Sequence, residues 1–369
     1  MKHNWEYKPL YSVGSIDFGK RIVAKETEPG PYFVYGGGGA TFTTKDYNRK
    51  DCTIVSRFAM SANCVRHVKG KFFLNDSGLS VKSKDKALTQ NFLDKFLFSI
   101  QPIIYNLGRG AAQKNLNVKD FAAITVPVPP LSEQLHVAAE LDRINEAIAA
   151  KEAQLKELDN LVKSQFIEMF GDLQASAPLS DFIESSFSGE WGNEDDNHEG
   201  VKVLRTTNFN NDGTLSFDKV VTRLIPESKI LKKHLQKGDI ILEKSGGTNE
   251  NPVGRVVYFN EDGLYLFNNF TMALRCKPKY DSLFVFYSLY YFYQLNKEEI
   301  RNMSSKTTGI ANLKMERYWK IPIKLADLNI QKRFADIVHQ TDRSKDIVRR
   351  QVEELRTLLA ARMDYWFND

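Results

Sequence analysis

The chain contains one long segment twice, and the two copies lie 197 residues apart. Residues 115–172 and 312–369 align without a gap, and both copies end in a related tetrapeptide, at 169–172 and at 366–369. The apolar positions also correspond, as in the pairs Ile124–Ile321, Val126–Ile323, Leu155–Val352, Leu158–Leu355 and Leu161–Leu358. A shared register of this length predicts a protein built as two similar halves. Such a chain approximates a two-fold dimer, which suits a target that is itself bipartite.

Length and composition are consistent with a soluble protein of several domains. A chain of 369 residues, 42% hydrophobic and 26% charged, should form two or more domains with separate cores. No apolar run approaches the roughly 20 residues of a membrane span, and the first residues lack an apolar signal core. Cys52, Cys64 and Cys276 have no metal-binding spacing, which predicts reduced thiols and a cytoplasmic location.

Positive charge is concentrated in the N-terminal block. Residues 1–123 contain 19 Lys and Arg against 10 Asp and Glu, a net charge of +9. Residues 124–172 contain 4 against 9, a net charge of −5. The positive charge of residues 1–123 is typical of a surface that binds nucleic acid. The alternative is a basic surface with no such partner. The acidic residues 124–172 are poorly suited to lie on phosphates.

The repeated segments predict two long helices. In both copies apolar residues recur every three or four positions, which is a heptad pattern with a polar interruption at Lys151 and at Lys345. The expected packing residues are Leu141, Ile144, Ile148, Leu155, Leu158, Val162, Val348, Val352, Leu355 and Leu359. The first helix should run from about residue 132 to 169, because Pro129-Pro130 blocks an earlier start. The two narrow seams predict an intramolecular antiparallel coiled coil; the alternative is that each helix packs on the domain before it.

The remaining blocks read as mixed α/β domains that resemble each other. Short β-rich runs such as 32–35, 53–55 and 240–242 are bounded by turn residues. Corresponding positions are offset by 169 near the start of the two domains and by 197 near their end, so the second domain carries about 28 extra residues. The predicted division is 1–123, 124–172, 173–320 and 321–369. A duplicated scaffold with different loops would suit two domains that have different binding specificities.

The segment Pro127-Val128-Pro129-Pro130-Leu131-Ser132-Glu133-Gln134 resembles one found in the specificity subunits of type I restriction–modification systems. There it links a target recognition domain to a long helix. Residues 5–10, 108–116 and 235–242 resemble the same family, and the likeness extends over essentially the whole chain. The second copy departs from the pattern at 326–331, where the prolines and the Glu are missing.

The resemblance implies two α/β (mixed α+β) target recognition domains separated by two long antiparallel helices in a pseudo-two-fold repeat. It implies a non-catalytic subunit that binds double-stranded DNA and reads one half of a split target with each domain. The helices would set the spacing and dock two methyltransferase subunits, which a restriction (translocase) subunit joins. S-adenosylmethionine, ATP and magnesium would belong to those partners, and this chain would hold no cofactor and no metal.

Polar and basic residues near predicted strand ends are the candidate DNA contacts. Arg57 and Lys244 occupy matched strand ends in the two domains, which is better evidence than either residue alone. Arg and Asn or Gln can read base edges, whereas Ser, Thr and Lys suit phosphates. The full set is Lys20, Arg21, Arg57, Arg109, Gln113, Lys114, Arg205, Asn208, Lys244, Ser245, Lys306, Thr307 and Thr308. For any single member, an ordinary solvated side chain is the alternative.

Sequence motifs for catalysis are missing from this chain. The Gly36–Gly39 run lacks dinucleotide-binding spacing, Ser245–Thr248 lacks the Walker lysine, and the six histidines are isolated. No Asn-Pro-Pro-aromatic tetrapeptide of a base methyltransferase occurs. Two other functions stay open from the residues: a stand-alone bipartite DNA-binding regulator, and a coiled-coil assembly protein that does not bind DNA. Apolar residues left exposed after the helices pair would favour a subunit with protein partners.

Overall fold

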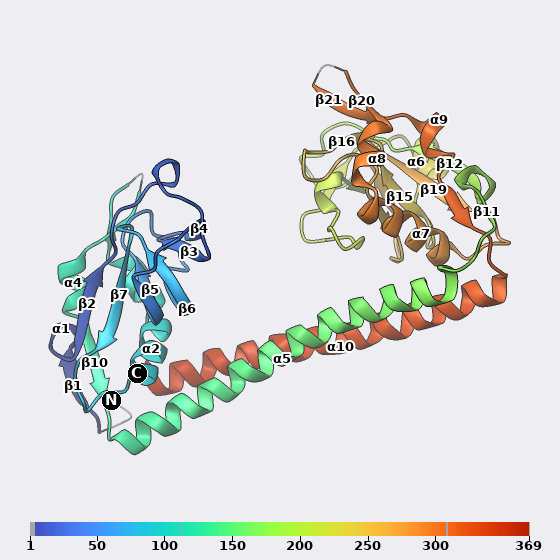
Figure 1. Ribbon diagram of the computed structural model, residues 1–369. Helices are drawn as coiled ribbons and strands as arrows, with labels where there is room; N and C mark the ends of the chain where they lie inside the picture. The colour runs from blue at the N-terminus through green and yellow to red at the C-terminus, as the bar shows by residue number, and fades with distance from the viewer. Residues whose placement is uncertain (1–3, 112, 308, 369) are drawn as a thin grey trace. The chain divides into compact units, whose positions relative to one another are not determined.

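The structure, a computed structural model, describes residues 4–111, 113–307 and 309–368 and divides into two compact units. One unit comprises residues 1–155 and 347–369, and the other comprises 156–346. Each contains one α/β domain and part of each long helix, α5 (Leu131–Phe170) and α10 (Leu328–Phe367) (Figure 1). This architecture confirms the predicted fold class. Because the division cuts both helices, the four predicted domain ranges are not tested and stay predictions.

Domain 1 is built on a six-stranded sheet in the order β2-β7-β5-β6-β3-β4. The sheet strands are β2 (Gly14–Phe18), β3 (Tyr32–Gly36), β4 (Gly39–Thr44), β5 (Arg49–Ser56), β6 (Val65–Leu74) and β7 (Gly78–Ser83). The other elements are β1 (Glu6–Pro9), α1 (Leu10–Val13), η1 (Ala24–Glu26), α2 (Gln90–Ser99), α3 (Gln101–Asn106), β8 (Gly108–Arg109), β9 (Asn115–Leu116), α4 (Val118–Ala122) and β10 (Thr125–Val128). The first strand, β1, pairs antiparallel with β10, the strand that leads into α5.

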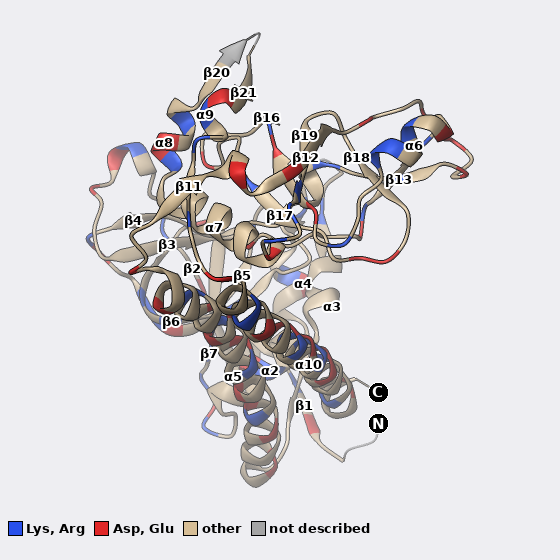
Figure 2. Cartoon of the chain, turned by 90° about the vertical axis from the view of Figure 1, so that its right-hand side faces the viewer, with Lys and Arg blue, Asp and Glu red and all other residues tan. Residues whose placement is uncertain are grey.

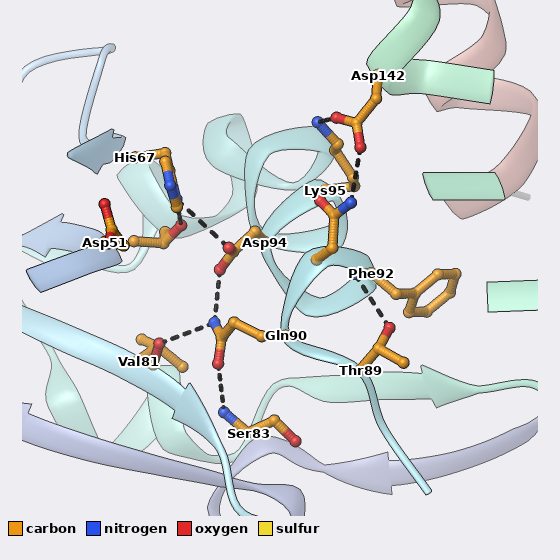
Figure 3. A network of polar contacts seen from close by, with 12 residues as sticks. Asp51, His67, Val81, Ser83, Thr89, Gln90, Phe92, Asp94, Lys95 and Asp142 are labelled. Carbon is orange, nitrogen blue, oxygen red and sulfur yellow. Dashed lines mark hydrogen bonds and ion pairs between the residues drawn. The ribbon is translucent and has the colours of Figure 1, made fainter. Parts of the chain in front are cut away.

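Helix α2 connects the sheet of domain 1 to the long helix α5. Thr89 caps its N-terminus, and its buried face carries apolar residues at helical spacing (Phe92, Leu93, Phe96 and Leu97). Gln90 accepts a hydrogen bond from the backbone of Ser83 in β7 and donates to Asp94 (Figure 3). On the opposite side, Lys95 forms an ion pair with Asp142 of α5.

Domain 2 carries the same elements with additions. Its two main sheets have the orders β12-β19-β15-β17 and β14-β13-β18. The first part comprises β11 (Ser176–Pro178), η2 (Leu179–Asp181), β12 (Ile183–Ser188), β13 (Val201–Leu204), η3 (Thr206–Asn208), β14 (Val221–Arg223), α6 (Glu227–Lys233), β15 (Ile240–Glu243) and β16 (Ser245–Gly246). The second part comprises β17 (Val256–Tyr258), β18 (Tyr265–Phe267), β19 (Thr271–Cys276), α7 (Ser282–Leu295), α8 (Lys297–Asn302), β20 (Ser304–Thr307), β21 (Ile310–Leu313), α9 (Met315–Tyr318) and β22 (Pro322–Lys324).

The two domains share long-range backbone hydrogen bonds at corresponding positions. The donor–acceptor pairs are Leu10–Ile124 and Leu179–Ile321, Asn75–Tyr35 and Asn268–Leu204, and Leu116–Arg57 and Leu313–Lys244, all at 2.8–2.9 Å. These bonds confirm the internal repeat. The offset rises from 169 at Leu204 to 187 at Lys244, so most of the extra residues of domain 2 lie between β13 and β15, where η3, β14 and α6 are found.

The two long helices run antiparallel within each unit. In the first unit Glu152 of α5 pairs with Arg356 of α10 at 2.8 Å, and Glu140 pairs with Arg362, farther along α10. In the second unit Lys345 pairs with Asp159 at 2.6 Å. Figure 2 shows acidic and basic residues interspersed along both helices, as such pairing requires. Of the ten expected packing residues, Leu141, Ile144, Val162, Val348 and Val352 are buried and the other five are half-buried.

Both helices also contribute to the domain cores. Leu141 of α5 and Leu359 of α10 join the core of domain 1. Val162 and Phe170 of α5 and Phe334 of α10 join that of domain 2. The alternative that each helix packs only on the domain before it is therefore too narrow, because each domain core uses residues from both helices.

Candidate nucleic-acid interface

In domain 1 several loops meet at the end of the sheet that lies farthest from α5. Strand β2 runs from Gly14, next to α1, to Phe18, and β5, which pairs with the other edge of β7, ends at Ser56 on the same side of the sheet. The backbone N–H of Arg57 donates to Ser77 at 2.8 Å, which joins the loop after β5 to the turn before β7. We call the surface formed by Phe18, Gly37–Gly39, Arg57–Phe58, Ser77 and Lys114 the distal end of domain 1.

Arg57 contacts three other residues of this distal end, Phe18, Phe58 and Ser77. Its guanidinium carbon lies 4.7 Å from the ring centroid of Phe18 and 4.6 Å from that of Phe58, so the cation is held between two aromatic faces. Both rings are substantially exposed, at 50% and 36%. The sequence analysis missed both phenylalanines, because nothing in the sequence shows that β2 ends beside the loop after β5.

The four-glycine run forms the turn between β3 and β4. A Cβ at Gly36 would lie 2.3 Å from the Ser77 hydroxyl, and one at Gly37 would lie 2.6 Å from the Phe58 carbonyl. Gly38 and Gly39 face open space, and Gly39 has a φ of 111°. The first two glycines therefore allow close packing on the Arg57 loop, and the last two leave backbone exposed beside it.

The other basic candidates of domain 1 differ in how firmly they are held. Lys20 and Arg21 are exposed after β2. Lys114 lies 3.9 Å from the ring centroid of Tyr105, and Gln113 beside it is exposed. Arg109 is not in a free loop as expected, since it belongs to the hairpin β8–β9 and forms an ion pair with Asp120 at 2.9 Å.

In domain 2, Lys244 follows β15 as Arg57 follows β5, but its side chain is turned to the protein. The ammonium donates to the Ser188 hydroxyl at 2.8 Å. Partial burial, with the nearby charge of Lys233, lowers the pKa of Lys244. The carboxylate before it, Glu243, is almost fully buried and pairs with Arg255 at 2.7 Å. The matched cations thus occupy the same backbone position in different environments.

Three further predicted residues of domain 2 take part in its internal hydrogen bonding. Asn208 is only 2% exposed, accepts from the backbone N–H of Arg205 and donates to the Ser216 carbonyl, so it belongs to the buried scaffold of the domain and not to the surface expected for a DNA contact. Arg205 donates to the Lys219 carbonyl at 3.2 Å and remains partly exposed. The Ser245 hydroxyl donates to Asn312 at 2.7 Å across the pair β16–β21.

The polar loop expected at 304–308 is largely a strand. Ser304–Thr307 form β20, which pairs antiparallel with β21 and with it makes a hairpin. Lys306 and Thr307 belong to β20, and Thr308 lies outside the described residues. Their predicted DNA contacts therefore stay predictions.

Apolar side chains remain exposed on both long helices. Leu161 of α5 is 42% exposed, and Leu358, its counterpart in the repeat, is 46% exposed. Ile167 and Ile347 are also about half exposed. Leu161 and Leu358 thus present exposed apolar side chains at equivalent positions of the repeat.

The described part of the chain contains no cluster of three His, Cys, Asp or Glu side chains suited to hold a metal ion. The expected absence of a cofactor and of a metal from this chain stays a prediction. Among the same residues, no helix combines the length and the apolar character needed to cross a membrane.

Comparison with known proteins identifies related sequences and folds. A family model described as the type I restriction modification DNA specificity domain matches residues 2–160 and 176–357. A protein of Methanocaldococcus jannaschii named as a type I restriction enzyme MjaX specificity subunit is 32% identical over 83 residues; these are 22% of this chain and only 20% of that relative.

Two solved structures share the fold. The type I restriction–modification S subunit from M. genitalium superposes with a TM-score of 0.59 and 17% identity, over 99% of this chain and 96% of that one. A chain from a structural study of complex assembly and conformational transition in the type I system has a TM-score of 0.56 and 18% identity, over 98% and 97%. At this identity the likeness concerns the fold.

Proposed function

We propose, from the premise that the chain belongs to the type I restriction modification DNA specificity family, that it reads a bipartite target in double-stranded DNA for a type I restriction–modification complex. Each domain reads one half-site, and the long helices set the distance between the half-sites. The helices also dock methyltransferase subunits, to which a restriction subunit is added. Such a complex acts on DNA in the cytoplasm.

A single observation carries this proposal: the two domains share a hydrogen-bonded scaffold but present different side chains at equivalent positions. The backbone N–H groups of Lys20 and Glu190 donate to equivalent strands, to Leu74 and Phe267. The first side chain is an exposed cation, whereas the second is a carboxylate held by Lys229 and Lys233. Two copies of one frame with different contact residues are suited to two different half-sites.

The exposed leucines support docking of two copies of one partner. Leu161 and Leu358 come from equivalent positions of the repeat, and they lie on the parts of α5 and α10 that belong to different units. A chain with two equivalent docking positions can bind the same subunit twice. This surface favours a specificity subunit over a stand-alone regulator, which has no use for it.

The proposal includes that the chain is not itself an enzyme. S-adenosylmethionine, ATP and magnesium would then be bound by the partner subunits, whose reactions require a flipped base or translocated DNA. The purified chain alone should neither methylate nor cleave DNA and should not hydrolyse ATP. Methyl transfer by rigorously purified chain with S-adenosylmethionine and DNA would refute this part.

The proposal that the long helices set the distance between the half-sites can be tested by removing one heptad from each helix. Residues 149–155 contain Glu152, whose partner Arg356 directly follows residues 349–355, so the two heptads lie close to each other and their joint deletion preserves the seam. The helices become about 10 Å shorter, on the order of three base pairs. Selection from a DNA library should then return the same half-sites with a shorter spacer. If the deletion variant folds and still selects DNA with the original spacer length, the helices do not set the distance between the half-sites.

A further inference from the structure

We propose that Arg57 reads a guanine in the half-site of domain 1, with Phe18 and Phe58 holding its guanidinium ready for that contact. This inference rests on the proposed function and adds the chemistry of one recognition step. It concerns domain 1 alone, because the equivalent cation of domain 2 is held differently.

The position of Arg57 is fixed by its backbone and by two rings. Its N–H donates to Ser77 and its carbonyl accepts from Leu116, both at 2.8 Å, so the residue is anchored on two sides. The guanidinium then lies between Phe18 and Phe58, less than 5 Å from each ring centroid. An arginine confined in this way has already lost most of the side-chain freedom that binding would otherwise restrict.

The hydrogen-bond donors of Arg57 are nevertheless free. Among the residues that the structure describes, no acceptor is paired with its guanidinium, which makes contact with the rings alone. The other anchored arginines of domain 1 are engaged: Arg49 donates to Ser80 and to the Phe18 carbonyl, Arg66 donates to Gly37, and Arg109 pairs with Asp120. Arg57 thus combines a fixed position with unused donors.

Free, oriented guanidinium donors match one base edge better than the others. Guanine presents two acceptors, O6 and N7, in the major groove, and arginine can bond both at once through its planar fork. A phosphate can also accept two hydrogen bonds from this fork, so a base contact and a phosphate contact are distinguished by their dependence on sequence and salt.

Lys244 lacks these properties. Its ammonium already donates to Ser188, and burial lowers its pKa, so it offers a point charge with no fixed plane. Lys114 stacks on Tyr105 but is likewise a single charged point. The distal end of domain 1 therefore has one side chain with the geometry for two-point recognition.

The test uses the full chain, purified from its host with the subunits that accompany it, and a DNA library that defines both half-sites. Arg57→Ala and Arg57→Lys should each lose preference at one guanine of one half-site, by roughly tenfold to a hundredfold. Arg57→Lys keeps the charge, so it should retain most of the overall affinity. Phe18→Leu and Phe58→Leu should weaken the same preference without changing the other half-site.

A base analogue separates base reading from charge. Replacing that guanine by 7-deazaguanine removes the N7 acceptor and should weaken binding by the wild type but not by Arg57→Ala. Lys50→Ala is the control, since this exposed cation lies at the start of β5, at the opposite end of the strand from Arg57, and should leave the preference intact.

Two results would overturn the inference. One is an unchanged target preference in Arg57→Ala. The other is a loss of affinity for all sequences together with a smaller salt dependence, because that result indicates a phosphate contact. Failure of the wild type to select any bipartite target would instead overturn the proposed function, so the two failures can be told apart.

Discussion

The indole rings of Trp5 and Trp366 stack on each other, with centroids 6.3 Å apart and planes inclined by only 8°. These residues lie near opposite ends of the chain, and the stack joins the first strand region to the last turn of α10 (Figure 1). Phe367 continues the contact onto α2, with its ring 5.3 Å from Phe92 and 5.9 Å from Phe96. The end of the second repeat thereby completes the core of domain 1.

Trp366→Ala should destabilise the unit that contains domain 1. The half-buried indole stacks on Trp5 and donates to Glu140 at 3.0 Å, so its loss should cost about 1–3 kcal/mol, less than the roughly 3–5 kcal/mol of a fully buried aromatic residue. Urea unfolding measures the change. Thr357→Ala, an exposed position earlier in α10, is the control. Equal midpoints for both variants would show that the stack contributes nothing.

Glu140→Gln should reduce the stability of the same unit at neutral pH but not in acid. The hydrogen bond from Arg362 lowers the pKa of Glu140, and Trp366 adds a second donor. A lowered folded-state pKa gives stability that is fully present above the unfolded value of about 4.5 and is lost as the pH falls through the folded value. The Tm difference between wild type and variant should be largest near pH 7 and should shrink below pH 4. A difference independent of pH would contradict this role.

Gln134→Ala should be more destabilising than Gln331→Ala. Both glutamines are fully buried at the start of a long helix, and each accepts from the backbone N–H of a helix N-cap, Thr89 or Asp281. Gln134 donates to two carbonyls, whereas Gln331 donates to Ala326. Each substitution leaves a buried backbone donor unpaired, at a cost of about 1–3 kcal/mol.

Urea unfolding of both variants tests this order, with Ser132→Ala, an exposed neighbour, as the control. If the glutamines also fix the angle between domain and helix, the folded Gln134→Ala variant should accept a wider range of DNA spacers. A normal spacer range would restrict Gln134 to a role in stability.

Leu161→Asp and Leu358→Asp should each remove one methyltransferase subunit from the complex. Each leucine is nearly half exposed, and a charge at the centre of an apolar contact should weaken docking at least about tenfold. The subunit ratio can be read from mass photometry, and the double variant should bind none. Asn160→Asp and Thr357→Asp, equivalent exposed neighbours, are the controls. A full complement of subunits in the double variant would exclude this docking surface.

The repeat, the heptad pattern and the prolines before Leu131 were enough to predict both long helices and the two α/β domains. The predicted first helix, at about 132–169, agrees with α5 at Leu131–Phe170, because helical periodicity and proline punctuation are local properties of the chain. The sequence also predicted that Arg57 and Lys244 occupy equivalent positions, and in the structure each directly follows a strand, β5 or β15.

Only the tertiary structure decided what each of these side chains contacts. Phe18 and Arg57 lie 39 positions apart, and they meet because β2 and β5 both pair with β7. The sequence predicted that Asn208 is a polar loop residue. In the structure the turn after β13 buries it, and its side-chain oxygen accepts from the backbone N–H of Arg205. The sequence by itself determined the duplicated elements, because their signals are local. Strand order across the sheet determined that Phe18 meets Arg57, because it brings together residues that no local pattern relates.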